Sequence, residues 1–101
     1  MAPDATPTGA ALPAGRVRVP EHVVRRGFGS ETVMLNLKTG QYHGINATGG
    51  RMLDVLEKTG DAAATASQVA ADFDVPVATV AADLAELLGA LAERGLIAVD
   101  G

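Results

Sequence analysis

The stretch Thr32–Gly50, TVMLNLKTGQYHGINATGG, constrains the fold more than any other part of the chain. Apolar and polar residues alternate over Glu31–Leu37, which is typical of a strand with one buried face. Gly40 closes a tight connection, and Gln41–Ile45 returns as the second strand of a hairpin. Asn46 is a good N-cap for a helix that follows without a linker. The stretch therefore predicts a hairpin that leads directly into a helix.

The alternation in the first strand of this hairpin predicts a core face made of Val33, Leu35 and Leu37. An earlier strand over His22–Arg26 precedes a turn at Gly27–Ser30, so the three strands are expected to form an antiparallel meander. Gln41–Ile45 comes last and is therefore expected at the free edge of the sheet. An edge strand presents unpaired N–H and C=O groups, and an extended peptide can bind to them.

Three helices follow the meander. The first is expected over Ala47–Lys58, with Gly60 ending it. A Thr-x-x-Gln capping box predicts that the second helix starts at Thr65. A third helix is predicted over Pro76–Arg94, with Pro at its first position and an apolar stripe wide enough to contact more than one element. The expected fold class is α+β: a three-stranded antiparallel β-meander packed on a three-helix, winged-helix-turn-helix-like bundle.

Length and composition indicate one domain over residues 16–101 of the 101-residue chain. Residues 1–15, MAPDATPTGAALPAG, show no periodic pattern and predict a disordered tail. They lack the segments of a signal peptide, and the chain has no run of 18 apolar residues, so a cytoplasmic protein without a membrane span is expected. The absence of cysteine excludes disulfides, thiolate nucleophiles and cysteine-ligated metals.

Charge is distributed unevenly along the chain. Residues 1–60 carry seven basic and five acidic side chains, a net charge of +2. Residues 61–101 carry one basic and seven acidic side chains, a net charge of −6. The second and third helices resemble a helix-turn-helix, so a winged-helix DNA-binding transcription regulator is the alternative function. DNA-binding versions present basic or amide side chains, but this third helix exposes Asp83, Glu86 and Glu93. The charge therefore argues against nucleic acid as a partner.

Arginines cluster in and before the first strand, at Arg16, Arg18, Arg25 and Arg26. Such a group most often forms a solvated face. Electrostatic contact with an acidic partner is the alternative interpretation.

The sequence contains no catalytic or metal-binding pattern. His22 and His43 are the only histidines, and no carboxylate cluster flanks either at the spacing of metal ligands. Neither Ser30 nor Ser67 lies in a nucleophile motif. Three glycines lie near the start of the first helix: Gly44, Gly49 and Gly50. No Lys follows them in the pattern of a phosphate-binding loop, so they predict close packing of that helix on the sheet. The protein is therefore expected to be no enzyme and to use no cofactor and no metal.

Two segments together resemble the PqqD-like family of precursor-peptide recognition elements, which serve the biosynthesis of ribosomally made, modified peptides. They are VMLNLKTGQYHGINATGGRMLDVL and TASQVAADFDVPVATVAADLAELLGALAERGLI. The hairpin turn followed by Gly-Ile-Asn-x-Thr-Gly is most similar to the lasso-peptide B-type leader-binding proteins. The likeness spans residues 20–99, and Ala47 departs from it because relatives often have Pro at the first helical position.

The resemblance implies that the leader peptide of a precursor adds as a strand to the sheet edge, in the cleft beside the third helix. Carried onto this chain, the edge comprises Gln41, Tyr42, His43, Gly44 and Ile45. The helix side of the cleft is expected to comprise Val77, Val80, Ala81, Asp83, Leu84 and Leu87. Asp83 and Glu86 are then expected to hold basic leader residues. The resemblance thus implies a non-catalytic module that delivers a precursor to a leader peptidase, and the precursor is expected to be that of a lasso peptide.

Overall fold

The computed structural model describes residues 12–100 and has the expected α+β architecture. One antiparallel sheet has the order β2–β3–β4, built from β2 (Val23–Phe28), β3 (Glu31–Asn36) and β4 (Tyr42–Ile45). Three helices follow, namely α1 (Ala47–Thr59), α2 (Ala62–Phe73) and α3 (Val77–Glu93). Two short strands, β1 (Arg16–Arg18) and β5 (Ala98–Asp100), form a second sheet. Residues 1–11 of the predicted tail lie outside the described residues.

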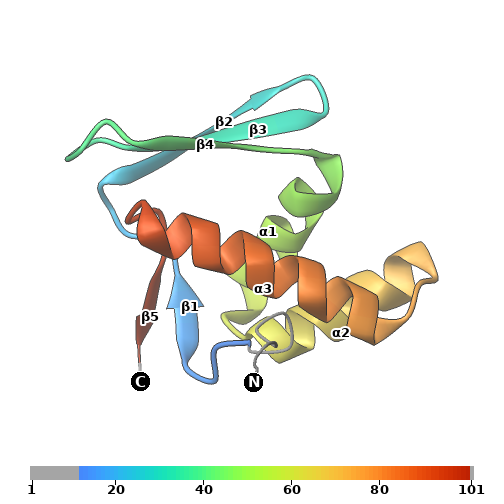
Figure 1. Cartoon of the computed structure of the whole chain (residues 1–101). Coiled ribbons are helices and arrows are strands. Elements are labelled where there is room, and N and C mark those ends of the chain that lie inside the picture. Colours follow the sequence, from blue (N-terminus) through green and yellow to red (C-terminus); the bar gives the residue numbers. More distant parts are fainter. Residues whose placement is uncertain (1–11, 101) are drawn as a thin grey trace, which may run out of the picture.

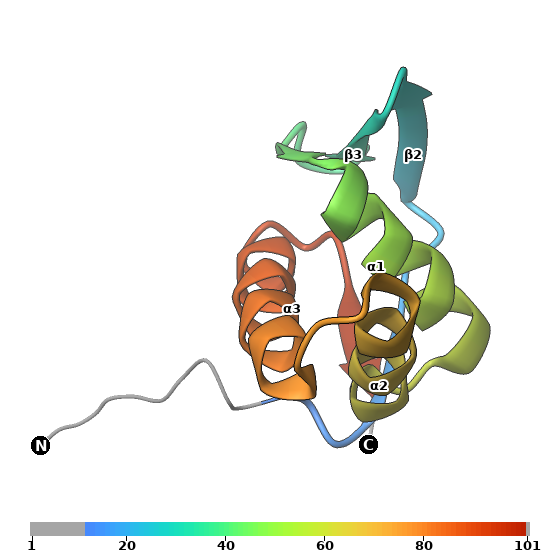
Figure 2. The same ribbon diagram turned by 90° about the vertical axis from the view of Figure 1, so that its right-hand side faces the viewer.

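The three-stranded sheet lies on one side of the helices, and α3 runs along the side where β4 lies (Figure 1). Figure 2 shows α1, α2 and α3 gathered into a bundle, with α2 and α3 joined by a short turn. The most apolar stripe of α3 is buried in the common core and comprises Val80, Leu84, Leu88 and Leu91. Between Leu12 and Asp100, no helix is both long and apolar enough to cross a bilayer.

The face of β3 that meets the core is the opposite of the one predicted. Met34 and Asn36 are buried. Of the residues predicted to face the core, Leu37 is 60% exposed, and Val33 and Leu35 are only half-buried. The prediction was wrong because it assumed that the more apolar set of an alternating strand always faces the core. The strand β2 also extends further than predicted, through Phe28, and Gly29 adopts a φ of 65° in the shortened turn.

Asn36 can be buried because its side chain has every hydrogen-bonding group matched. Its amide nitrogen donates to the carbonyls of Arg94 at 3.0 Å and Gly95 at 3.3 Å, just after α3. Its Oδ1 accepts from the N–H groups of Lys38 at 2.9 Å and Thr39 at 3.3 Å, in the β3–β4 turn. Gly95 has a φ of 66°, and a Cβ there would lie 2.7 Å from the Asn36 amide nitrogen. We call these contacts the Asn36 clamp, because they join the hairpin to the end of α3.

Two helix starts differ from their predicted positions. The N-cap of α2 is Asp61, whose side chain accepts from the N–H of Ala64 at 3.2 Å, so the helix begins three residues before Thr65. Thr65 is buried inside the helix, and its hydroxyl donates to the carbonyl of Asp61 at 2.8 Å. The capping-box prediction failed because an acceptable cap lies one turn earlier. Pro76 likewise is the N-cap of α3 and not its first residue.

The pairing of β1 with β5 was not predicted. Arg18 in β1 donates from Nε to Asp100 Oδ2 in β5 at 2.7 Å, across 82 positions of the chain. The N–H of Val17 donates to the carbonyl of Gly60 at 2.9 Å, which attaches this small sheet to the end of α1. Each strand has only three residues, and Pro20 had indicated a break, so local sequence carried little signal for the pair.

Two of the four clustered arginines, Arg18 and Arg25, form ion pairs within the molecule. Arg25 lies on the helix side of β2 and forms ion pairs with Asp54 and Glu57 of α1, and it also donates to the carbonyl of Gly50. Arg18 pairs with β5, as described above. These contacts favour an intramolecular role over contact with an acidic partner.

We expect Asn36→Ala to lower the free energy of unfolding by about 2 kcal/mol, because the groups bonded to the side chain lose their partner. Urea denaturation followed by circular dichroism measures the change. Gln41→Ala is the matched control, since this exposed neighbour lies in the same hairpin. A loss below about 0.5 kcal/mol for Asn36→Ala would show that the clamp contributes little to stability.

Candidate functional site

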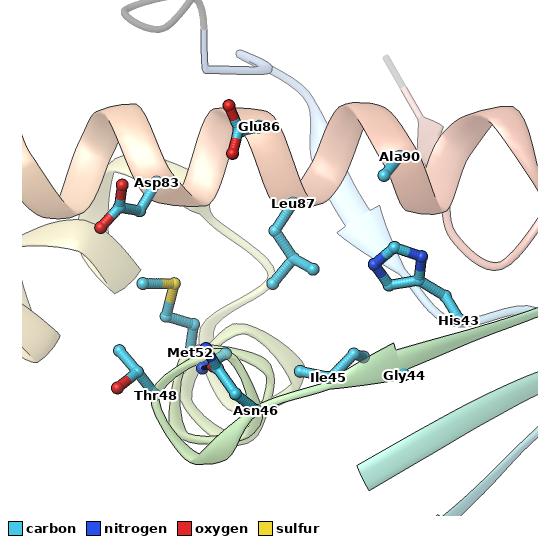
Figure 3. A pocket seen from close by; sticks show the side chains of 11 residues that line it. His43, Gly44, Ile45, Asn46, Thr48, Met52, Asp83, Glu86, Leu87 and Ala90 are labelled. Carbon is cyan, nitrogen blue, oxygen red and sulfur yellow. Dashed lines mark hydrogen bonds between the residues drawn. The ribbon is translucent and has the colours of Figure 1, made fainter. Parts of the chain in front are cut away.

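A cavity of about 510 Å³ lies between β4 and α3 (Figure 3). Its volume is within the range of about 300–1,000 Å³ that is common for ligand-binding sites. Leu87 projects from α3 toward β4, His43 and Ala90 lie at one end, and Asp83 lies at the other (Figure 3). The lining residues come from β4, the start of α1 and one face of α3: His43, Gly44, Ile45, Asn46, Thr48, Gly49, Met52, Asp83, Glu86, Leu87 and Ala90.

The first turn of α1 closes the side of the cavity between β4 and α3. Asn46 is the N-cap, as predicted, and its Oδ1 accepts from the N–H of Gly49 at 2.8 Å. A Cβ at Gly49 would lie 2.6 Å from Ile45 Cγ2 and 3.5 Å from Leu87 Cδ2. The absence of a side chain at Gly49 therefore lets α1 approach β4 closely, as expected for a glycine at this position.

The backbone of β4 has one set of hydrogen-bonding groups directed away from the sheet. The N–H of Asn36 donates to the carbonyl of Gln41 at 2.8 Å, which fixes the bonded register between β3 and β4. Bonded pairs recur at every second residue of an antiparallel ladder, so His43 and Ile45 bond to β3. The N–H and C=O groups of Tyr42 and Gly44 therefore face the free edge. These four groups are available to an added strand.

The same register separates the side chains of β4 between the two faces of the sheet. His43 lies opposite Met34 on the helix side, and both His43 and Ile45 line the cavity. Tyr42 lies opposite Leu35 on the outer face and is 66% exposed. An added strand would follow the same period of two, with alternate side chains directed into the cavity and onto the outer face.

The cavity is acidic at the end nearest the start of α1. Asp83 and Glu86 are both exposed, and the lining contains no Lys or Arg. Four ion pairs form within residues 12–100, and neither carboxylate takes part in them. The site therefore favours a ligand that brings a positive charge to this end, and a negative charge there would be repelled.

Six of the residues predicted for the site line the cavity: His43, Gly44, Ile45, Asp83, Glu86 and Leu87. Gln41 is exposed just before β4, and Tyr42 contributes backbone groups to the edge while its ring lies on the outer face. The structure therefore brings the predicted edge together with one part of the predicted helix wall.

The remaining predicted helix residues lie elsewhere. Val80 and Leu84 are buried in the core, and Ala81 packs against that core. Val77 is 48% exposed in the first turn of α3 and does not line the cavity. The most apolar face of a helix is the one that the core buries, so that face was not available to the site.

Sequence reasoning missed Ala90 on α3 and the lining residues at the start of α1, namely Asn46, Thr48, Gly49 and Met52. The α3 face toward β4 repeats at Asp83, Glu86, Leu87 and Ala90, which are spaced as one helical stripe. This mixed stripe lies beside the apolar stripe of the core, and its spacing was a usable signal. Thr48 and Met52, one turn apart on α1, carried no comparable signal because they become neighbours of β4 only through the helix approach at Gly49.

The fold and this site together define a class of small α+β domains in which an open sheet edge lies beside a helix of a winged helix-turn-helix bundle. The chain belongs to the PqqD family, described as coenzyme PQQ synthesis protein D, which it matches over residues 31–97. That range runs from β3 to the end of the core and includes the whole cavity lining. No curated protein matches the chain.

Two solved structures are similar to this chain. The structure "TbiB1 in Complex with the TbiA(beta) Leader Peptide" has 31% sequence identity and a TM-score of 0.73, covering 83% of this chain and 98% of that one. The structure "Lasso peptide synthetase B1 complexed with the leader peptide" has 20% identity and a TM-score of 0.72, covering 82% and 98%. The second likeness shows the shared fold alone.

We expect Gly49→Ala to destabilise the protein by about 1–2 kcal/mol, although Ala normally favours a helix, because the new methyl group would collide with buried Ile45. Gly50→Ala is the matched control, since its Cβ would meet only Thr32 Oγ1, at 3.4 Å. It should raise stability by about 0.5–1 kcal/mol. Thermal unfolding of both variants measures the difference, and equal effects would contradict the close approach at Gly49.

Proposed function

We propose that this protein binds the leader peptide of a ribosomally made precursor, as a strand added to β4, and delivers that precursor to a processing leader peptidase. The observation that carries the proposal is the free edge at Tyr42 and Gly44, directly beside a cavity of about 510 Å³. The likeness to TbiB1, a protein solved with a leader peptide, supports it. The module itself catalyses no reaction in this proposal; delivery to a peptidase follows from the family resemblance.

The size of the site sets what a leader must provide. Four backbone hydrogen bonds contribute about 1 kcal/mol each, and micromolar binding requires about 8 kcal/mol. An apolar side chain of the size of Leu contributes about 2 kcal/mol when buried. The leader therefore needs at least two apolar anchors in addition to its backbone. Alternate residues of an added strand face the cavity, where Ile45, Met52 and Leu87 supply apolar surface.

The acidic end of the cavity favours a basic leader residue near Asp83 and Glu86. It also weighs against the alternative function, a winged-helix DNA-binding regulator. In that class the helix after the turn enters the major groove and contacts phosphates and bases with basic or amide side chains. Here the same helix carries Asp83, Glu86 and Glu93, so duplex DNA would be repelled.

Fluorescence anisotropy with labelled, synthetic 20-residue leader peptides tests the proposal. The peptides are taken from any precursor gene found next to the gene of this protein. The unmodified protein should bind such a peptide with a micromolar or lower Kd. Gly44→Pro should weaken binding at least about tenfold, because it removes an N–H from the free edge and places a ring there.

Gly27→Pro is the matched control. The N–H of Leu37 donates to the carbonyl of His22 at 2.8 Å, and this register directs the N–H of Gly27 away from β3, at the opposite edge of the sheet. Its leader affinity should equal that of the unmodified protein. Failure of the unmodified protein to bind the leader would refute the proposal, and tight, salt-sensitive binding of duplex DNA would favour the regulator.

Charge reversal at the acidic end should weaken leader binding without affecting the fold. We expect Glu86→Lys to raise the Kd by about two- to fivefold, with a larger effect at low ionic strength, as exposed ion pairs are weak and screened by salt. Glu93→Lys is the control, because it changes charge on the same helix outside the cavity lining. Equal effects of the two variants would mean that only net charge matters and that no leader cation lies at this end.

A further inference from the structure

The three-stranded sheet has a second open edge, at β2. The order β2–β3–β4 leaves no further strand beside β2 among residues 12–100, and Figure 2 shows this strand at the outer side of the sheet. The bond from the N–H of Leu37 to the carbonyl of His22 fixes the register of β2 on β3. The N–H and C=O groups of Arg25 and Gly27 therefore face outward. With six residues, β2 is longer than β4, which has four, so an incoming strand has two edges to choose between.

The two edges differ in charge. The sequence of β4, Tyr-His-Gly-Ile, has no Lys, Arg, Asp or Glu, whereas β2 has two adjacent arginines. Arg25 lies on the helix side, where Asp54 and Glu57 neutralise it. Arg26 lies opposite Val33 on the outer face and is exposed. It takes part in none of the four ion pairs within residues 12–100, so its positive charge beside the edge is uncompensated.

Arg26 also occupies a hydrogen-bond acceptor on the β2 edge. Its Nη1 donates to the carbonyl of Arg25 at 3.1 Å. Of the three β2 residues whose backbone faces this edge, Arg25 is the middle one, between Val23 and Gly27. An added strand would donate to the same carbonyl, so the guanidinium group stands where that strand would bind. Charged side chains on edge strands commonly prevent such pairing.

Pairing of β2 with a second copy of itself would bring two Arg26 side chains together. The N–H of Val23 already donates to the carbonyl of Pro20 at 3.1 Å. Two antiparallel β2 strands therefore bond through both backbone groups when Arg25 of one copy pairs with Gly27 of the other. Arg26 then lies directly opposite Arg26 of the second copy, in a non-bonded pair whose Cα atoms are about 4.5 Å apart. Like charges at directly opposite positions are destabilising.

We infer that Arg26 closes the β2 edge to added strands, so that a leader strand is directed to β4 alone. For the leader the inference rests on the proposed function, whereas exclusion of a second copy stands without it. The basic leader residue that Asp83 and Glu86 would attract beside β4 is repelled by Arg26 beside β2. Arg26 is thus a specificity-determining residue that lies outside the cavity lining.

The experiment follows the backbone amides of both edges by NMR while the synthetic leader peptides described above are added. In the unmodified protein, the amides of Tyr42 and Gly44 should shift. The outward-facing amides of β2, those of Arg25 and Gly27, should not. Arg26→Thr removes the charge and the bond to the carbonyl, and Thr favours a strand. Excess leader should then also shift the two β2 amides, with an affinity at least about tenfold above the limit for the unmodified protein.

A second readout needs no leader. Sedimentation velocity should give free Arg26→Thr a dimerisation constant at least about tenfold above that of the unmodified protein. Arg26→Lys, which keeps the charge, should behave as the unmodified protein. Arg16→Thr makes the same change in net charge at an exposed residue of β1 and should affect neither edge. Adding Gly27→Pro to Arg26→Thr should abolish the new binding, because proline removes an N–H from the β2 edge.

Leader-induced shifts at Arg25 and Gly27 in the unmodified protein would overturn the inference, because the edge would be open despite Arg26. It would equally be overturned if Arg26→Thr showed neither new shifts at this edge nor stronger dimerisation. In both cases, shifts at Tyr42 and Gly44 would leave the proposed function intact. Absence of any leader-induced shift in β4 of the unmodified protein would instead refute the proposed function, and the sedimentation comparison would still test Arg26.

Discussion

The Asn36 clamp is the contact on which the geometry of the site depends. It joins the turn of the β3–β4 hairpin to the end of α3, through a buried side chain that donates to Arg94 and Gly95 and accepts from Lys38 and Thr39. At the opposite end, Asn46 caps α1 and Gly49 lets that helix meet β4. With β4 and α3 held at both ends, a cavity remains between them.

This arrangement also explains why the sheet edge stays open. In an antiparallel sheet, each residue directs its backbone groups to one neighbour only, and β3 uses both of its sides for β2 and β4. The groups of Tyr42 and Gly44 on the far side of β4 therefore have no strand to bond. Native proteins usually protect such an edge. Here α3 runs beside it without covering it, which suits an edge that binds a partner strand.

Sequence patterns predicted the fold well where one local signal decided it. Asn46 and Gly60 marked both ends of α1, and the hairpin placed β4 last in the meander. The patterns failed where long-range packing decided the outcome. The hydrogen bonds of Asn36 determine which face of β3 is buried. The core buries the most apolar stripe of α3, so a neighbouring, mixed stripe faces β4. The β1–β5 pair depends on contacts across 82 positions, which no local pattern records.

Hydrogen–deuterium exchange of individual amides, measured by NMR with and without the leader peptide, tests the central claim most directly. The account predicts that the amides of Tyr42 and Gly44 exchange rapidly in the free protein and become protected when the leader binds. The amides of His43 and Ile45, which already bond to β3, should change little. New protection confined to the α2–α3 turn, or none in β4, would contradict strand addition at this edge.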